Sequence, residues 1–234
     1  GKRGYGERSS EENMNRILMN TAMEGLHESM LEMGRLCERG IDEVLSAIYR
    51  SDKELAATVV ARDDSIDEME RRIETQCILA RFSPVANDLR AVTAAMGIIS
   101  DLERIGDQCA DIAEMVEHLC GADKHIQPMA DLRLMGDTAR SMVHDALDSY
   151  IGGDAEKAKG VTMRDDIVDA ALERVILHLT NIMRESPDAV SQAVDMLFVA
   201  KYFERIADHA TNIGEWSVYL STGTHPLDKE LRQE

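Results

Sequence analysis

Four pairs of acidic residues in this 234-residue sequence share a spacing of four positions, about one turn of an α-helix. Asp63, Asp67, Glu103 and Asp107 are called here the first acidic group, and Asp165, Asp169, Glu204 and Asp208 the second acidic group. On a helix, each pair places two carboxylates on one face, where like charges repel and destabilise the helix by about 0.2–0.5 kcal/mol. Such pairs beside a packed core need a compensating positive charge.

A hard metal cation is the simplest compensating charge. Carboxylate oxygens from adjacent helices form oxygen-rich sites that suit iron(III), manganese, magnesium or calcium, and zinc is also compatible with them. We therefore predict carboxylate-bound metal ions, iron foremost, at two similar sites. The competing interpretation is a solvated acidic surface whose acids pair with four arginines that also repeat: Arg62, Arg104, Arg164 and Arg205. We favour the metal because clustered acids beside a core need a partner.

The acids flank apolar residues that recur at helical spacing. Beside Asp63 and Asp67, this apolar line contains Ile66, Met69 and Ile73. Beside Glu103 and Asp107, it contains Ile98, Leu102, Ile105, Cys109 and Ile112. Both patterns predict amphipathic helices whose buried stripe lies next to the carboxylates.

Capping and turn signals divide the chain into helices. Ser51–Glu54 forms a capping box, which predicts a helix start with the Ser51 hydroxyl as the cap. Ser83-Pro84 predicts another start, with a capping hydroxyl before a proline in the first turn, and Ser186-Pro187 repeats it. Gly152–Asp154 lies in the second half where Ser51-Asp52 lies in the first. Gly121–Pro128 combines a helix-ending glycine, polar residues and a proline, which is typical of a linker.

The two halves of the chain are copies of one another. Met33-Gly34 recurs as Met135-Gly136, and Arg62–Asp64 recurs as Arg164–Asp166, both shifted by 102 positions. Glu103–Ile105 recurs as Glu204–Ile206 with a shift of 101. Short loops force neighbouring helices to run antiparallel. We therefore predict an all-α fold of two tandem antiparallel three-helix bundles with six long helices, at residues 11–121 and 129–221, joined by a linker at 122–128.

Composition restricts the classes of function. With 44 acidic and 26 basic residues, the net charge of −18 repels phosphate backbones, so nucleic acid is excluded as a partner. The spacing of Cys37, Cys77, Cys109 and Cys120 matches neither a disulfide framework nor a CxxC motif, so we expect reduced cysteines. No apolar run approaches the roughly 20 residues that span a bilayer, and there is no signal peptide, so we expect a cytoplasmic protein without an integral membrane segment.

Several segments together resemble one known family. Leu102–Asp107, its counterpart Phe203–Asp208, the paired Arg-Asp-Asp-x-x-Asp segments and Pro84–Arg90 are similar to motifs of the PhoU family. The resemblance extends from about Glu24 to Leu220. Gln108-Cys109 and Asp111 depart from the pattern, because the family more often has His-Ala and Asn there.

The resemblance implies the two-bundle fold and metal-binding E/DxxxD motifs. Carried over to this chain, these motifs are the four pairs of the first and second acidic groups. It also implies a cytoplasmic negative regulator of phosphate uptake that links the phosphate-specific ABC transporter, on its ATPase side, to a phosphate-sensing histidine kinase. We also expect a homodimer.

Two other interpretations of the helical pattern predict different functions. A carboxylate-bridged di-iron oxidase or iron-storage bundle needs two Glu-x-x-His motifs, and only Glu24–His27 fits. A coiled-coil structural protein without metal does not account for the duplicated acids. No phosphate-binding glycine loop or catalytic triad motif is present, so we predict no enzymatic activity. His209, directly after Asp208, is the one histidine placed to reach a metal at these motifs.

Overall fold

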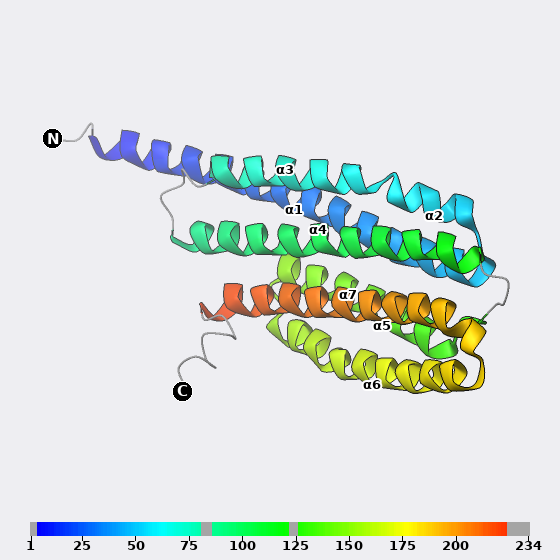
Figure 1. Ribbon diagram of the computed structural model, residues 1–234. Helices are drawn as coiled ribbons and strands as arrows, with labels where there is room; N and C mark the ends of the chain where they lie inside the picture. Colours follow the sequence, from blue (N-terminus) through cyan, green and yellow to red (C-terminus); the bar gives the residue numbers. More distant parts are fainter. Residues whose placement is uncertain (1–3, 81–85, 122–125, 224–234) are drawn as a thin grey trace.

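The computed structural model describes residues 4–80, 86–121 and 126–223, and within these ranges it contains helices and no strands. The helices are α1 (Gly4–Arg50), α2 (Lys53–Val60), α3 (Asp63–Ala80), α4 (Ala86–Cys120), α5 (Ala130–Gly152), α6 (Ala155–Glu185), the 3₁₀ helix η1 (Pro187–Ala189) and α7 (Val190–Thr222). Figure 1 shows α1 to α4 packed lengthwise in one bundle and α5 to α7 in another, with α4 beside α7. The predicted all-α class with two helical bundles is confirmed.

The prediction of six long helices is wrong in one place. The second helix of the first bundle is divided into α2 and α3 by a turn at Ala61-Arg62, whereas its counterpart α6 is continuous. Both copies contain the same Arg-Asp-Asp sequence at this point. The Arg-Asp-Asp sequence by itself therefore does not explain the break.

The helix caps differ from the predicted capping box. Asp52, not Ser51, is the N-cap of α2, and its side chain accepts from the amide of Leu55 at 3.0 Å. Ser51 instead ends the preceding turn with φ of 53°, a left-handed conformation that favours glycine. In the second bundle, Gly153 has this conformation, with φ of 66°, and Asp154 is the N-cap.

The two Ser-Pro sequences were each predicted to begin a helix with a serine cap. Ser83-Pro84 lies outside the described residues. Ser186 precedes η1 but makes no side-chain capping hydrogen bond, so its hydroxyl does not have the predicted role.

At the linker, the amide of Ile126 donates to the buried Gln192 Oε1 of α7 at 2.8 Å. This bond holds the end of the linker against the second bundle.

Two reciprocal contacts join α1 to α5. A Cβ atom added to Gly34 of α1 would lie 2.4 Å from Leu147 Cδ2 of α5. A Cβ atom added to Gly136 of α5 would lie 2.7 Å from Leu45 Cδ1 of α1. Each glycine thus receives a leucine of the other copy, and any larger residue there would require that leucine side chain to shift.

Aromatic side chains also cross between the bundles. Tyr150, 1% exposed near the end of α5, donates its hydroxyl hydrogen to the carbonyl of Ala91 on α4 at 3.1 Å, and its ring packs edge-on against His27 of α1. Trp216 of α7 lies against Gly97 of α4, where an added Cβ would be 2.2 Å from the indole.

The four cysteines and the hydropathy of the helices can be compared with the expectations about disulfides and membrane segments. All four cysteines are free thiols, and Cys37, Cys77 and Cys109 are buried in the core. Among the described residues, no helix combines the length and apolar character required to cross a membrane.

Candidate metal site

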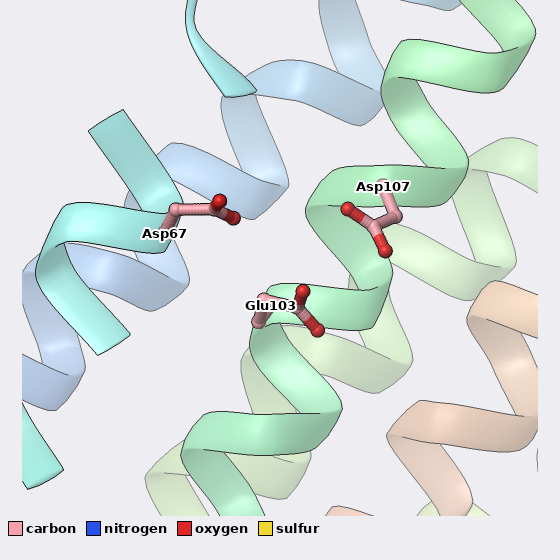
Figure 2. Close-up of side chains that lie close together, drawn as sticks. All are labelled: Asp67, Glu103 and Asp107. Carbon is pink, nitrogen blue, oxygen red and sulfur yellow. The ribbon is translucent and has the colours of Figure 1, made fainter. Parts of the chain in front are cut away.

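Three carboxylates of the first acidic group converge between α3 and α4. Asp67 projects from α3 toward Glu103 and Asp107, which lie one turn apart on α4 (Figure 2). One oxygen from each of the three side chains lies within 4.8 Å of those of the other two. Cations bind carboxylate oxygens at about 2.0–2.6 Å, so one ion between them could contact all three.

The packing of α3 on α4 explains why these carboxylates meet. The predicted core lines are confirmed, since Ile66 is 5% exposed and Ile98, Leu102, Ile105 and Ile112 are fully buried. A Cβ atom added to Gly106 of α4 would lie 2.8 Å from Ile66 Cδ1 of α3. Asp67 follows Ile66 and Asp107 follows Gly106, so the contact places both acids at the edge of the interface.

The proximity of the acids changes their acidity. Burial, reinforced by the charge of Asp107, raises the pKa of Glu103 to about 7. Burial also raises the pKa of Asp63 to about 6, together with the charges of Asp107 and Asp67. Burial and the charge of Asp67 raise the pKa of Asp107 as well. A bound cation would relieve this repulsion and favour the ionised carboxylates.

Asp63 takes a different position from the other members of the first acidic group. It is not one of the three convergent residues, and its buried Oδ1 has no hydrogen-bond partner. Asp165, the matching residue of the second acidic group, has the same unpartnered Oδ1. Such an oxygen needs a proton or a cation nearby. Both aspartates thus retain a free acceptor next to the pairs.

Two of the four repeated arginines, Arg62 and Arg164, bind acids outside the two acidic groups. Arg62 binds Glu43 of α1 through two hydrogen bonds, at 2.5 and 3.2 Å. Arg164 binds Asp145 of α5 at 2.6 Å. Among the described ion pairs of the first acidic group, Asp67 contacts Arg71 at 3.2 Å, and that arginine side chain is 68% exposed. The solvated-surface interpretation therefore lacks the Arg62 and Arg164 pairings that it expects.

The second acidic group is more open than the first. Burial and the charges of Asp208, Asp169 and Glu204 raise the pKa of Asp165 to about 6, so these carboxylates interact. Among the described residues, however, only the first group brings three ligand oxygens within 4.8 Å of one another. Lys201 also places its ammonium group 2.7 Å from Glu204 Oε1. The expected similarity of the two groups therefore holds for their sequence and not for their geometry.

Sequence reasoning missed several polar residues near these groups. Glu70 of α3 faces the first group, and burial together with the charges of Glu74 and Asp67 raises its pKa. The sequence signal for Glu70 was its position three residues after Asp67, which places the two side chains on one face of a helix.

His209 does not join the carboxylates: its Nδ1 lies 2.9 Å from Oδ1 of Asp101 on α4. No sequence signal linked these two residues, which are 108 positions apart.

The donor set of the first group fits a hard cation. Its three convergent ligands are all carboxylates, they come from the two helices α3 and α4, and they are neither fully buried nor fully exposed. Oxygen ligands of this kind suit iron(III), manganese, magnesium or calcium better than soft thiolate-preferring metals. The three ligands would leave further coordination positions for water or for another group.

Comparison with known proteins finds similarity over most of the chain. A family model described as the PhoU domain matches twice, at residues 30–116 and 132–217. A phosphate-specific transport system accessory protein PhoU homolog of Clostridium acetobutylicum is 38% identical over 213 residues, which cover 90% of this chain and 97% of that protein. The homolog of Pseudomonas aeruginosa is 35% identical over 207 residues, covering 88% of this chain and 86% of that protein.

Solved structures resemble the fold to a similar extent. The crystal structure of PhoU from Pseudomonas aeruginosa superimposes with a TM-score of 0.81 at 35% identity, covering 88% of this chain and 99% of that chain. The phosphate transport system regulatory protein PhoU from Streptococcus pneumoniae gives a TM-score of 0.83 at 29% identity, covering 88% and 98%.

Proposed function

The chain belongs to the PhoU family, and from that premise we propose that it is a regulator of phosphate uptake that binds metal cations at its acidic groups. Proteins of this family are accessory and regulatory proteins, and the chain accordingly is not an enzyme. The relatives are named as accessory proteins of the phosphate-specific transport system. This naming supports a role beside the phosphate-specific transport system. That the role is cytoplasmic, on the ATPase side of an ABC transporter and with a phosphate-sensing histidine kinase as second partner, is the further part of the proposal and rests on the family resemblance.

The convergence of Asp67, Glu103 and Asp107 is the observation that carries the metal proposal. The raised pKa values of Glu103 and Asp63, and the engagement of Arg62 with Glu43, support it further. When bound, the cation supplies positive charge between α3 and α4. The three carboxylates would hold it, and Asp63 and Glu70 would supply further acceptors nearby.

Elemental analysis tests the metal proposal directly. The protein is purified without chelator, and metal per chain is measured beside thermal unfolding with and without added chelator. We expect a stoichiometric cation, iron foremost, and a lower unfolding midpoint after chelation, because a ligand that binds only the folded state stabilises it. Absence of metal combined with an unchanged midpoint would show instead that the acids are a solvated surface.

The regulatory proposal is tested in the host. Deleting the protein should leave phosphate-starvation genes switched on when phosphate is plentiful, since a negative regulator would be missing. A variant with Glu103→Gln and Asp107→Asn, introduced at the normal locus, asks whether the acids are needed for that repression. Normal repression in the deletion strain, with no second copy of the gene present, would contradict the role.

A di-iron oxidase is the less favoured alternative. The convergent ligands include no histidine, and the one Glu-x-x-His segment, Glu24–His27, lies on α1, where the His27 ring packs against Tyr150. Oxygen consumption by iron-loaded protein distinguishes the two functions. An oxidase consumes oxygen in proportion to the ferrous iron added, and a regulator does not exceed the buffer rate.

A further inference from the structure

An apolar strip runs along the exposed side of the first half of α7. Val190, Val194 and Phe198 follow one another at intervals of four residues, and all three are exposed, Phe198 by 50%. Tyr202 lies one turn further along, and the centre of its ring is 6.5 Å from that of Phe198. Residues four apart lie on one face of a helix, so these four side chains form one continuous strip.

Two carboxylates of α4 lie beside the aromatic end of this strip. Burial and the charges of Asp111 and Glu114 raise the pKa of the Tyr202 hydroxyl, which places both carboxylates near that group. Burial and the charges of Glu114 and Asp107 also raise the pKa of Asp111. Arg205 of α7 acts in the opposite direction on both groups, but it is one cation among three acids. The charge beside the strip is therefore negative.

The corresponding surface at the other end of α4 is closed by the chain itself. At the shift of 101 positions, Gly97 corresponds to Phe198, and Met115 corresponds to Trp216. Trp216 lies directly on Gly97, where an added Cβ atom would be 2.2 Å from the indole. At the strip, a phenylalanine replaces the glycine and a methionine replaces the tryptophan, and the ring of Phe198 stays half exposed. The contact between α4 and α7 thus has one closed end and one open end.

The polar contact of the closed end has no equivalent at the open end within the described residues. At the closed end, Oδ1 of Asp101 on α4 lies 2.9 Å from Nδ1 of His209 on α7. At the same shift, Tyr202 stands where Asp101 stands, and Gln108 stands where His209 stands. Gln108 is 5% exposed, and in the part of the chain that the structure describes its Oε1 has no hydrogen-bond partner. The open end is therefore held neither by a tryptophan cover nor by a polar contact of this kind.

An arginine side chain fits an exposed aromatic ring beside two carboxylates. Its planar guanidinium group stacks on aromatic faces and donates two parallel hydrogen bonds to a carboxylate. The chain uses the first of these contacts internally, since Cζ of Arg133 lies 4.6 Å from the centre of the Tyr49 ring. The apolar strip beside the acids fits the apolar face of a helix, whose side chains recur at the same spacing. The surface therefore matches an amphipathic helix that carries arginines along one edge.

A second copy of this chain matches the surface less well. In a two-fold dimer joined there, Asp111 and Glu114 of one subunit would approach the same two acids of the other. Any other arrangement would bring up a chain with a net charge of −18. Like charges across an interface oppose association, so the negative surface selects a basic partner.

We propose that this surface docks an amphipathic, arginine-bearing helix of a partner protein. It is called here the aromatic–acidic patch and consists of Asp111 and Glu114 of α4 and of Val190, Val194, Phe198 and Tyr202 of α7. Arginines of the partner pair with the two carboxylates, and its apolar side chains lie along the strip. The inference rests on the proposed regulatory role, because a regulator without enzymatic activity acts through a partner. It does not depend on a bound cation, since none of these residues belongs to the two acidic groups.

Fluorescence anisotropy with a synthetic helical peptide tests the docking. The labelled peptide has about 18 residues, which is about five helical turns, with leucines on one face and arginines along one edge. A peptide of the same composition in scrambled order has the same charge without the apolar face. The measurement is made in chelator at about 0.15 M ionic strength, which screens non-specific attraction. We expect the full chain to bind the amphipathic peptide at least about tenfold more tightly than the scrambled one.

Phe198→Ala shows whether the peptide binds on the strip. We expect it to weaken binding of the amphipathic peptide at least about tenfold, because aromatic side chains at the centre of an interface carry much of its binding energy. Met163→Ala is the control, since Met163 is 74% exposed on α6 and lies outside the patch. This variant should bind like the wild type. Both side chains are at least half exposed, so neither change removes core packing.

The two carboxylates are tested by a double substitution. Asp111→Asn with Glu114→Gln should weaken peptide binding at least about threefold, the combined effect of two exposed ion pairs. Glu24→Gln with Glu28→Gln is the matched control, because it also removes two charges, both exposed and on α1. It should leave the affinity unchanged. An equal loss in the two double variants would mean that net charge alone attracts the peptide, which overturns the docking.

Two other results in solution also overturn the docking. One is equal binding of the amphipathic and scrambled peptides, or an equal effect of Phe198→Ala and Met163→Ala. The other is a wild-type dimer that Phe198→Ala dissociates in sedimentation measurements, because a second copy of the chain would then occupy the patch.

The host separates the docking from the regulatory role. Phe198→Ala at the normal locus should leave phosphate-starvation genes switched on in plentiful phosphate, as deletion does. Normal repression by Phe198→Ala in a host whose deletion strain loses repression overturns the docking and leaves the regulatory role intact. Normal repression in the deletion strain overturns the regulatory role, and the docking on which it was based falls with it.

Discussion

Arg62 and Glu43 form a two-pronged ion pair between the α2–α3 turn and α1, with side chains that are 21% and 16% exposed. The arginine that precedes Asp63 in sequence is thereby committed to another carboxylate. Arg164 and Asp145 repeat this arrangement in the second bundle at 2.6 Å. The repeated arginines at these positions join helices and do not neutralise the acids beside them.

Replacing Arg62 therefore affects stability and not cation binding. Arg62→Met leaves the largely buried Glu43 without its strongest partner, and we expect the free energy of unfolding to fall by about 1–3 kcal/mol. Arg71→Met is the control, because its pair with Asp67 is exposed and should change stability by less than about 0.5 kcal/mol. Denaturant unfolding and Mn²⁺ binding of both variants are the measurements. Loss of Mn²⁺ binding in Arg62→Met with little destabilisation would contradict this assignment.

Asp107→Asn changes the stability of the protein in opposite directions under the two interpretations of the first acidic group. If a cation joins the three carboxylates, removing one lowers both the metal content and the unfolding midpoint. If no cation binds, the substitution removes like-charge repulsion and raises stability by about 0.2–0.5 kcal/mol. Thermal unfolding with and without chelator, beside elemental analysis, decides between them. If chelator leaves the wild-type midpoint unchanged and Asp107→Asn is at least as stable as the wild type, the acids are a solvated surface without a cation.

The raised pKa values predict how stability changes with pH. Glu103 rises from 4.5 to about 7, and Asp63 and Asp165 rise from 3.8 to about 6. Between about pH 4 and 7, the folded protein therefore holds more protons than the unfolded chain, so the contribution of these groups to stability falls as pH rises. In chelator, Glu103→Gln should flatten the decrease in unfolding free energy that the wild type shows from pH 5 to 7.5.

Cation binding should show the reverse pH dependence. The carboxylates must lose their protons to bind a metal, so added Mn²⁺ should stabilise the protein more at pH 7.5 than at pH 5. Proton release on Mn²⁺ binding, measured by calorimetry in buffers of different ionisation enthalpy, checks this directly. Equal stabilisation at both pH values would mean that Mn²⁺ binds away from these acids.

Lys201 makes the second acidic group less available to a metal than the first. Its ammonium group lies 2.7 Å from Glu204, and the corresponding residue of the first bundle is Ser100. Lys201→Met should increase Mn²⁺ affinity at the second group by up to about fivefold, the effect of one exposed ion pair. Ser100→Lys should weaken the first group by a similar factor. Binding unaffected by both changes would exclude Lys201 as a competitor.

Ser51→Gly should stabilise the protein. The residue has φ of 53°, and the corresponding Gly153 has φ of 66°. Relief of the left-handed strain exceeds the extra chain entropy of glycine, so we expect a gain of about 0.5–1 kcal/mol. The reverse change, Gly153→Ser, should lower stability by a similar amount. Denaturant unfolding of both variants measures the difference.

Helical periodicity was sufficient to predict most of the fold. The apolar lines through Ile66 and Ile105 are local patterns, and the duplication could be read from matching residues, so the helices and the two bundles followed. The Arg-Asp-Asp sequence did not predict the break between α2 and α3, because the same three residues lie within continuous helix in α6. The Ser51 cap was misassigned because both Ser51 and Asp52 are good capping residues and only the backbone geometry separates them.

The spacing of the acids could be read from the sequence, and their arrangement in space could not. Spacing predicted eight candidate acids, of which three converge among the described residues. The packing of α3 on α4 near Gly106 brings those three together, and this depends on tertiary structure. The same limit applies to Asp101 and His209, which belong to different bundles. Their contact depends on how the two copies pack, and no periodic pattern within one helix carries that information.

The reciprocal contacts of Gly34 with Leu147 and of Gly136 with Leu45 have a consequence for the origin of the architecture. Each copy presents the same patch, with a glycine and a leucine, to the same patch of the other, which is the arrangement of an isologous dimer. The polypeptide thus contains within one chain the kind of interface that elsewhere joins two identical subunits. Covalent linkage replaces a bimolecular association by an intramolecular one, so the two copies remain paired at any protein concentration.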